Sequence, residues 1–298
     1  MKCETPSASG VLYLVATPIG NLGDLGFRAV EVLKAVALIA CEDTRHSRPL
    51  LDHYGIDRPL VALHEHNENK MSARLIERLL AGESVGLVSD AGTPLINDPG
   101  YPLVRQAREA GIRISPIPGP CALIAALSAS GLPGHRFAFE GFPPRKSAAR
   151  RTFFKALLAE TRTQIFYEAS HRVEETLRDA ALVFPATRRL VIGRELTKRY
   201  ETLVSTTVGE APGLLAADPE MRLGEFVLLI EGATDRLETE ALTPEQARIL
   251  GLLLRDHSVK SAVNLTVEIT GARRDAVYRE ALRLSSGGPE AGEPESAY

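Results

Sequence analysis

Short apolar runs alternate with amphipathic segments along the first 130 or so residues of the chain. Five of these runs are long enough for one buried strand each, and we expect strands over residues 11–16, 36–40, 60–63, 85–88 and 112–117. Between the first two runs, Phe27, Val30 and Leu33 recur with helical spacing after Asp24, a predicted N-cap. Alternation of strands and helices predicts a mostly parallel sheet with helices on both faces.

This pattern breaks at Gly131-Leu-Pro-Gly134, where we place a domain boundary. The strands expected beyond it lie closer together in sequence, which favours a mixed sheet. They cover residues 137–142, 164–167, 189–193, 201–205 and 226–230. The sequence therefore predicts an α/β fold with a mostly parallel N-terminal domain over 11–133 and a mixed-sheet α/β domain over 134–232.

A helical module is predicted after a polar linker over residues 233–242. Thr243-Pro-Glu-Gln246 has the pattern of a capping box with proline at the first helical position. We expect helices over 245–256, 258–269 and 273–284, so that residues 243–286 form a small module resembling a helix-turn-helix. Residues 1–10 are expected to be a flexible N-terminus, and 287–298, rich in Gly, Pro, Glu and Ser, a disordered tail.

Composition limits where the protein works and what it binds. No apolar run reaches the ~18 residues that a membrane span needs, and the N-terminus does not resemble a secretory signal. Three scattered cysteines indicate a reducing cytoplasm and no disulfide framework. The net charge of −3 does not favour nucleic acid, so any RNA contact must come from local basic patches.

Polar clusters follow the predicted strands of the first domain. The carboxyl ends of parallel strands meet at one edge of a sheet, so these clusters should form one site built from several loops. They are Thr17–Asn21, Glu42–Arg45, His64–Glu68, Ser89–Asp98 and Pro118–Ala122.

The loop after residues 85–88 is the strongest candidate for a ligand loop. Residues 90–100 hold two prolines, two glycines and two carboxylates, more than an ordinary strand-to-helix connection needs. We expect Asp43 and Asp98 to cap the helices that follow them. Asp90 and Glu168 end apolar strands and are harder to explain as caps, which makes them candidates for the chemistry.

Missing motifs narrow the ligand further. The chain has neither a dinucleotide-binding glycine motif nor a P-loop, and prolines stand where a phosphate cradle needs free N–H groups. A nucleoside without phosphates is therefore favoured over NAD or ATP. The nucleophile-elbow motif of serine hydrolases is absent as well. His64-Glu65-His66 could hold a metal, but no cysteine or further histidine clusters with them, so we predict no metal site.

Several motifs together carry a specific resemblance to a known family. In the first half they are Tyr13–Leu22, Cys41–Arg45, His64–Asn67, Ser89–Pro94, Asp98–Gly100 and Pro118–Pro120. In the second half they are Phe139–Pro143, Phe166–Glu168 with His171-Arg172, Arg194–Lys198 and Gly224-Glu225. The sequence resembles the ribosomal RNA small subunit methyltransferase I family, within the tetrapyrrole methylase superfamily, over residues 11–285.

The resemblance implies a two-domain tetrapyrrole-methylase-like fold and 2′-O-methylation of a cytidine in the decoding region of 16S rRNA. It implies S-adenosylmethionine as the methyl donor, bound in a cleft between the two α/β domains. It further implies 16S rRNA or the small ribosomal subunit as partner, and a homodimer. By alignment with the superfamily, the donor contacts would be Pro18, Ala91, Gly92, Thr93, Ile96, Cys121, Ala122, Tyr167 and Glu168.

A ribose 2′-OH is a weak acid, so a general base would help its methylation. Asp90 and Glu168 are the candidates for that role. We expect RNA phosphates to be held by basic residues of three regions: a loop, an arginine pair and the C-terminal module. The loop contributes Arg145, Lys146, Arg150 and Arg151, and the pair is Arg45 and Arg48.

Two alternatives have different consequences. A tetrapyrrole C-methyltransferase on the same fold would act on a small macrocycle, which needs neither the basic loop nor the helical module. A non-catalytic nucleic-acid-binding protein would use the C-terminal helices, but most of the chain would then have no task, and the net charge is negative.

Overall fold

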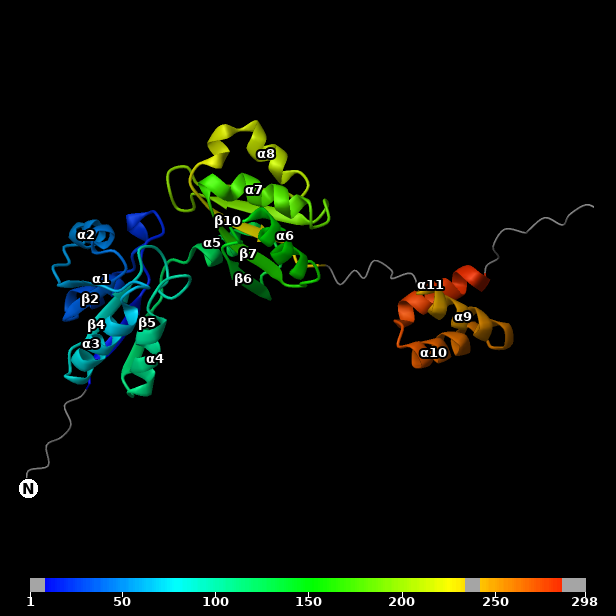
Figure 1. Ribbon diagram of the computed structural model, residues 1–298, viewed down its shortest axis with the longest axis horizontal. Coiled ribbons are helices and arrows are strands. Elements are labelled where there is room, and N and C mark those ends of the chain that lie inside the picture. The colour runs from blue at the N-terminus through cyan, green and yellow to red at the C-terminus, as the bar shows by residue number, and fades with distance from the viewer. Residues whose placement is uncertain (1–8, 234–241, 286–298) are drawn as a thin grey trace, which may run out of the picture. The chain divides into compact units, whose positions relative to one another are not determined.

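The computed structural model describes residues 9–233 and 242–285. The chain forms two compact units, residues 1–233 and residues 234–298 (Figure 1). The predicted N-terminus, linker and tail lie wholly or largely outside the described residues. The predicted limits at 11–133 and 134–232 stay predictions, because both ranges belong to the first unit.

The first sheet has five strands in the order β3-β2-β4-β1-β5, and every neighbouring pair is parallel, as predicted. The strands are β1 (Val11–Val15), β2 (Leu38–Cys41), β3 (Leu60–Ala62), β4 (Val85–Val88) and β5 (Arg113–Ile117). The helical segments between them are η1 (Leu22–Asp24), α1 (Phe27–Ala35), α2 (Thr44–His53), α3 (Glu68–Leu80) and α4 (Tyr101–Glu109).

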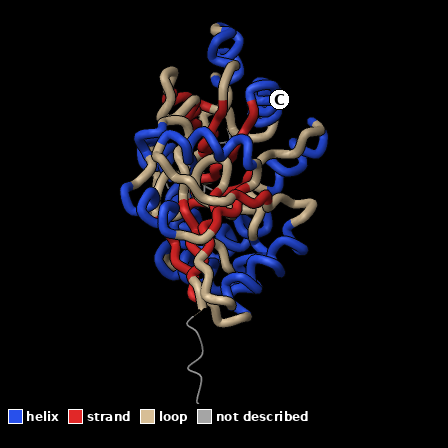
Figure 2. The backbone as a smooth tube through the Cα atoms, turned by 90° about the vertical axis from the view of Figure 1, so that its left-hand side faces the viewer, coloured by secondary structure: helices blue, strands red, loops and turns tan. Residues whose placement is uncertain are grey.

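Side chains alternate between the two faces of this sheet and form two separate cores. In β2, Leu38 and Ala40 pack with residues of α3 and α4. Ile39 and Cys41, which alternate with them along the strand, pack with residues of α1 and α2 on the other face. Both faces are therefore covered by helices, which explains why the strands read as continuous apolar runs. Figure 2 shows strands inside and helices around them.

The second sheet is mixed, with strand order β6-β7-β10-β8-β9. Only β6 and β7 pair in parallel, and the other neighbours are antiparallel. The strands are β6 (Phe137–Gly141), β7 (Thr163–Ala169), β8 (Arg189–Arg194), β9 (Thr202–Thr207) and β10 (Glu225–Ile230). The helical segments that follow β6, β7 and β9 are α6 (Ser147–Ala156), α7 (Ser170–Ala181), α8 (Ala211–Ala217) and η2 (Pro219–Arg222).

Helix α5 (Ala122–Ser130) joins the two sheets. It follows β5 of the first sheet, yet its buried side chains Leu123, Ala126 and Leu127 pack against β7, β8 and β10 of the second sheet. Figure 1 shows α5 beside β7 and β10. Helices α6, α7 and α8 cover the opposite face of the second sheet.

The second unit contains α9 (Pro244–Asp256), α10 (Val259–Thr270) and α11 (Arg274–Ser285). They pack around Leu250, Val263 and Val277. The predicted capping box is present, because the Thr243 side chain accepts from the Gln246 amide and the Gln246 side chain accepts from the Thr243 amide. Within residues 9–233 and 242–285, no helix is both long and apolar enough to cross a membrane.

Two of the predicted helix caps are wrong. The N-cap of α1 is Gly26, and Asp24 lies in η1. The N-cap of α4 is Gly100, with φ of 120°, so Asp98 lies two residues before the cap and does not fill that role. The third prediction is confirmed, because the Asp43 side chain accepts from a backbone amide in the first turn of α2.

Candidate functional site

A cavity of about 380 Å³ lies where loops of the first sheet meet strands of the second. Its wall includes the loop after β4, the start of α5, the end of β7 and the start of β10. This volume is in the range of small-molecule sites. All of these segments belong to the first unit.

The loops after β1 and β4 are tied together at the cavity. The Thr17 and Gly92 amides donate to each other's carbonyl oxygens at 2.9 and 3.1 Å, and the Thr17 hydroxyl donates to the Ser89 carbonyl at 3.1 Å. Gly92 has φ of 82°, and a Cβ there would lie 3.3 Å from Ile19 Cγ2 and 3.7 Å from the Pro120 carbonyl oxygen. Glycine lets three loops approach closely at this point.

One end of the cavity is acidic. Asp98 is half-buried, and its Oδ2 atom is buried without a hydrogen-bond partner among the described residues. Burial raises the pKa of Asp98 to about 6; the charges of Glu42 and Asp90 act in the same direction, and the Ser89 side chain opposes them. Asp90 differs, since its Oδ1 accepts from the Asp43 amide at 3.2 Å. Asp98 is therefore the lining carboxylate with a buried oxygen that accepts no hydrogen bond from the described residues.

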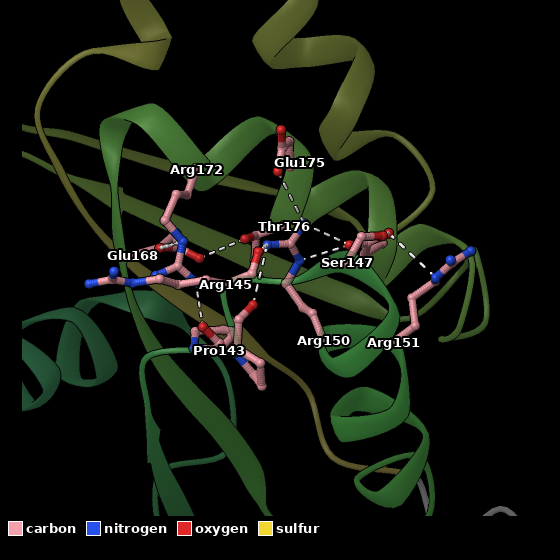
Figure 3. Close-up of polar contacts among 11 residues, drawn as sticks. Pro143, Arg145, Ser147, Arg150, Arg151, Glu168, Arg172, Glu175 and Thr176 are labelled. Atoms are coloured by element: carbon pink, nitrogen blue, oxygen red, sulfur yellow. Dashed lines mark hydrogen bonds and ion pairs between the residues drawn. The ribbon is translucent and has the colours of Figure 1, made fainter.

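Glu168 lies on the same wall, but its carboxylate is engaged within the protein (Figure 3). Its side chain is 0 % exposed. The Thr176 hydroxyl donates to Oε2 at 2.6 Å, and the Ala169 amide donates to Oε1 at 2.9 Å. Arg172 Nε lies 3.4 Å from Oε1. These contacts hold Glu168 and Arg172 in fixed positions.

Tyr167 forms an aromatic part of the wall. Its hydroxyl accepts from the Leu123 amide at 3.1 Å, which attaches the start of α5 to β7. Its ring packs edge-on against Phe139 and Phe142, with centroids 4.8 and 5.8 Å away. Burial raises the pKa of Tyr167 to about 12, so the phenol stays neutral.

Eight of the nine predicted donor contacts line this cavity, and the ninth, Pro18, is buried next to the lining residue Ile19. Other lining residues were not among the predicted donor contacts or candidate bases, although three of them, Ile19, Asn97 and Asp98, belong to polar clusters predicted to form the site. The full set is Ile19, Asn97, Asp98, Phe142, Ala169, Leu196, Lys198, Glu225, Phe226 and Val227. Lys198 and Glu225 do belong to motifs that carried the family resemblance, and this was the available signal for them.

Lys198 is a cation that lines the cavity between two carboxylates. Its Nζ lies 2.9 Å from Glu195 Oε1 and 2.9 Å from Glu225 Oε2. Burial lowers the pKa of Lys198, but the hydrogen bonds to Glu225 and Glu195 outweigh this effect, and its pKa is raised. The lysine is therefore charged at neutral pH.

The basic residues predicted to bind RNA separate into two kinds. Arg45, Arg145, Lys146 and Arg151 are exposed, and Arg48 is half-buried. Arg150 is 0 % exposed, so the prediction that it binds RNA is wrong. Its Nε donates to Asp179 at 2.8 Å, and its Nη1 donates to the carbonyls of Pro144 and Arg145 (Figure 3). A buried charge needs such partners, and they leave Arg150 no access to RNA.

The composition of the wall suits a nucleoside joined to an amino acid. Ile19, Tyr167 and Val227 supply apolar surface for a flat base. Lys198 and the carboxylates of the wall can pair with a carboxylate and an ammonium group of a ligand. Among the described residues, no group of three or more His, Cys, Asp or Glu is placed to hold a metal ion.

The fold and the cavity define a methylase of the tetrapyrrole methylase class. The family model for Tetrapyrrole (Corrin/Porphyrin) Methylases matches residues 11–212, and the model for the RsmI C-terminal HTH domain matches residues 240–285. Solved structures share the fold. The methyltransferase CobJ aligns with a TM-score of 0.56 at 18 % identity, covering 76 % of this chain and 95 % of its own. Uroporphyrin-III C-methyltransferase from Thermus thermophilus aligns with a TM-score of 0.53 at 22 % identity, covering 74 % of this chain and 94 % of its own.

Relatives named ribosomal RNA small subunit methyltransferase I are much more similar in sequence. The protein of Xylella fastidiosa (strain Temecula1) is 54 % identical over 91 % of this chain and 99 % of its own length. The Pseudomonas aeruginosa protein is 51 % identical over 93 % of this chain and 98 % of its own length. This chain belongs to the ribosomal RNA small subunit methyltransferase I family, which confirms the predicted resemblance and fold class. It is an S-adenosylmethionine-dependent rRNA methyltransferase, so the non-catalytic alternative is wrong.

Proposed function

We propose that this enzyme methylates the ribose 2′ oxygen of a cytidine in the decoding region of 16S rRNA, as a homodimer in the cytoplasm. The observation that carries the choice of an oxygen acceptor is the half-buried Asp98 in the cavity wall, whose buried Oδ2 has no hydrogen-bond partner among the described residues. A hydroxyl must lose its proton when it is methylated, and a carboxylate with a raised pKa is suited to take it.

The donor would lie against the loop after β4 and the start of α5. Ala91, Gly92 and Thr93 offer backbone groups and a hydroxyl, and Tyr167 and Ile96 offer apolar surface. The remaining predicted contacts are Pro18, Cys121, Ala122 and Glu168. When bound, S-adenosylmethionine supplies a methyl group on a sulfonium centre, which an oxygen nucleophile takes as the carbon–sulfur bond breaks.

The three carboxylates near the reacting atoms have different tasks in this proposal. Asp98 takes the proton of the 2′-OH. Asp90, a predicted candidate for that role, contributes a neighbouring negative charge that raises the pKa of Asp98. Glu168, the other predicted candidate, positions Arg172 and the end of β7, because both of its oxygens already accept hydrogen bonds.

Small ribosomal subunits and free 16S rRNA from a strain lacking this protein provide the test. They would be incubated with the enzyme and methyl-labelled donor, and the RNA would then be hydrolysed in alkali. A 2′-O-methyl group blocks cleavage at its own nucleotide, so we expect the label in one alkali-resistant dinucleotide that begins with methylated cytidine. Label on a base, or on no RNA, would contradict the proposal.

The homodimer needs a separate measurement. Sedimentation or light scattering of the purified protein should give twice the mass of 32.3 kDa. A monomer over the working concentration range would remove this part of the proposal and leave the chemistry untouched.

A further inference from the structure

A second pocket, of about 500 Å³, opens at the start of α7. It contains His171 and Arg172, which belong to a motif of the family resemblance. In the reaction proposed above, neither residue contacts the substrate. The lining residues are Phe142, Pro143, Pro144, Arg145, Ala169, His171 and Arg172. Two of them are arginines and one is a histidine, and none of the described lining residues is acidic. We name this site the Arg145–Arg172 pocket.

Arg172 is a fixed cation in this pocket. Its side chain is only 14 % exposed, its Nη2 donates to the Pro143 carbonyl, and its Nε lies 3.4 Å from Glu168 Oε1 (Figure 3). Glu168 is itself held by Thr176 at 2.6 Å. The guanidinium therefore cannot swing away, and an anion that binds beside it meets a preorganised charge.

Hydrogen bonds from a buried arginine fix the backbone of the loop that carries Arg145. The buried Arg150 donates to the carbonyls of Pro144 and Arg145 at 3.4 and 3.3 Å, and it pairs with Asp179 at 2.7 Å. Arg150 thus fixes the backbone that presents Arg145, although it lies too deep to meet RNA.

Two exposed donors complete the pocket. Neither the Arg145 nor the His171 side chain has a hydrogen bond or ion pair within the described parts of the chain. Figure 3 shows Arg145 extending toward the side of Arg172 and Glu168, away from Arg150 and Arg151. Glu168 pairs with Arg172, and Asp179 pairs with Arg150, so neither carboxylate compensates the charge of Arg145.

The pocket adjoins the donor cavity, because Phe142 and Ala169 line both. In an RNA strand, the 2′ oxygen and the 3′ phosphate of one nucleotide sit on neighbouring ribose carbons. An acceptor ribose that reaches the donor cavity therefore brings its own phosphodiester within a few bond lengths of it. Arginine side chains recognise phosphate oxygens with two parallel hydrogen bonds, and such contacts position a strand without reading its sequence.

We propose that the Arg145–Arg172 pocket binds the phosphodiester next to the acceptor ribose; this rests on the proposed 2′-O-methylation of RNA. Arg172 supplies the fixed charge, and Arg145 and His171 close on the phosphate from solvent. The pocket is thereby the element that sets which ribose along the strand faces Asp98.

The test uses Arg145→Ala, His171→Ala and the double variant, with a fluorescently labelled single-stranded RNA oligonucleotide as the probe. Binding would be measured by anisotropy over a series of KCl concentrations. The slope of log K against log salt is about −0.7 per phosphate for single strands, so losing one contact should flatten it by about 0.7 and weaken binding roughly fivefold at 0.1 M salt. Because both residues bind the same phosphate, the double variant should flatten the slope little more than Arg145→Ala.

Lys155→Ala is the matched control, since Lys155 is an exposed cation near the end of α6, outside the pocket. It should leave the salt slope unchanged. A double variant that binds RNA with the slope and affinity of the wild type would overturn the proposal. So would an equal loss of affinity for S-adenosylhomocysteine in calorimetry, because the residues would then serve the donor cavity.

These outcomes are independent of the alkali-resistance assay. Label on a base of the RNA would refute 2′-O-methylation, whereas an unchanged salt slope would refute only the phosphate pocket. The two failures can therefore be told apart with the same protein preparations.

Discussion

Asp98→Asn should make the protein more stable and much less active, a combination that an ordinary structural residue does not give. Burial raises the pKa of Asp98 from 3.8 to about 6, which means that the folded state disfavours the charged form. At 1.36 kcal/mol for each pKa unit, a raise of this size corresponds to about 3 kcal/mol. Solvent screens a half-buried group, so we expect about 1–2 kcal/mol of it to be measurable.

The sign follows from linkage. The folded pKa is above the unfolded value, so the wild type has its full stability from this group below about pH 4 and loses it as the pH rises through about 6. Asparagine carries no charge at any pH. Asp98→Asn should therefore match the wild type at acid pH and exceed it at pH 8, where the melting temperature should rise by about 2–4 °C per kcal/mol.

Activity should change in the opposite direction. Removing the proton acceptor should lower kcat by about 10²–10⁴-fold, while the affinity for S-adenosylhomocysteine in calorimetry stays near that of the wild type. The wild-type log kcat should increase with pH and level off above about 6, as Asp98 becomes ionised beside Glu42, Asp90, Ser89 and Tyr167.

Asp52→Asn is the control, because Asp52 is an exposed carboxylate of α2. It should change stability by less than about 0.5 kcal/mol and leave kcat unaltered. If Asp98→Asn keeps a kcat within a few-fold of the wild type, another group takes the proton, and Asp90→Asn becomes the next variant. If it is less stable than the wild type at pH 8, the inference that the charge is disfavoured there is refuted.

Three further variants test other parts of the structure. Gly92→Val should weaken S-adenosylhomocysteine binding at least tenfold in calorimetry, because φ of 82° and Ile19 Cγ2 at 3.3 Å leave no room for a side chain; unchanged affinity would place the donor elsewhere. Arg150→Ala removes the buried cation that pairs with Asp179 and leaves it the Ser147 hydroxyl and the half-exposed Arg151, 3.8 Å away; it should cost about 3–5 kcal/mol in denaturant unfolding. A cost below 1 kcal/mol would refute the importance of the Arg150–Asp179 pair. Leu250→Ala should lower the unfolding free energy of the second unit by about 2–5 kcal/mol and leave the affinity for the donor unchanged. Weaker donor binding would contradict the inference that the donor cavity belongs to the first unit alone.

Strand positions were accessible from sequence because they depend on local apolar pattern. The predicted run 85–88 coincides with β4, and the other nine strands were placed within a few residues. The mixed character of the second sheet was also correct. Each strand could be recognised from a stretch of three to seven residues, since a strand needs only its own apolar side chains to be recognisable.

Asp98 was assigned wrongly because capping was inferred from neighbours in sequence alone. Asp–Pro before an apolar segment is a common helix start, but Leu95 and Asn97 adopt φ of 70° and 71°, which turns the chain and delays α4 to Tyr101. The burial of Arg150 was hidden for a similar reason. Its partner Asp179 lies 29 residues away on another helix, and no local pattern indicates that pairing.

The path of α5 has a consequence for dividing the protein into parts. This helix comes from the first sheet, but its apolar side is buried by the second. A fragment that ended at residue 133, the predicted domain boundary, would expose the apolar side chains of Leu123, Ala126 and Leu127 to solvent. An exposed apolar patch of this kind promotes aggregation. It would also lose the Tyr167 hydroxyl that attaches the start of α5. The two halves are thus one unit of folding and of solubility, even though each has its own sheet.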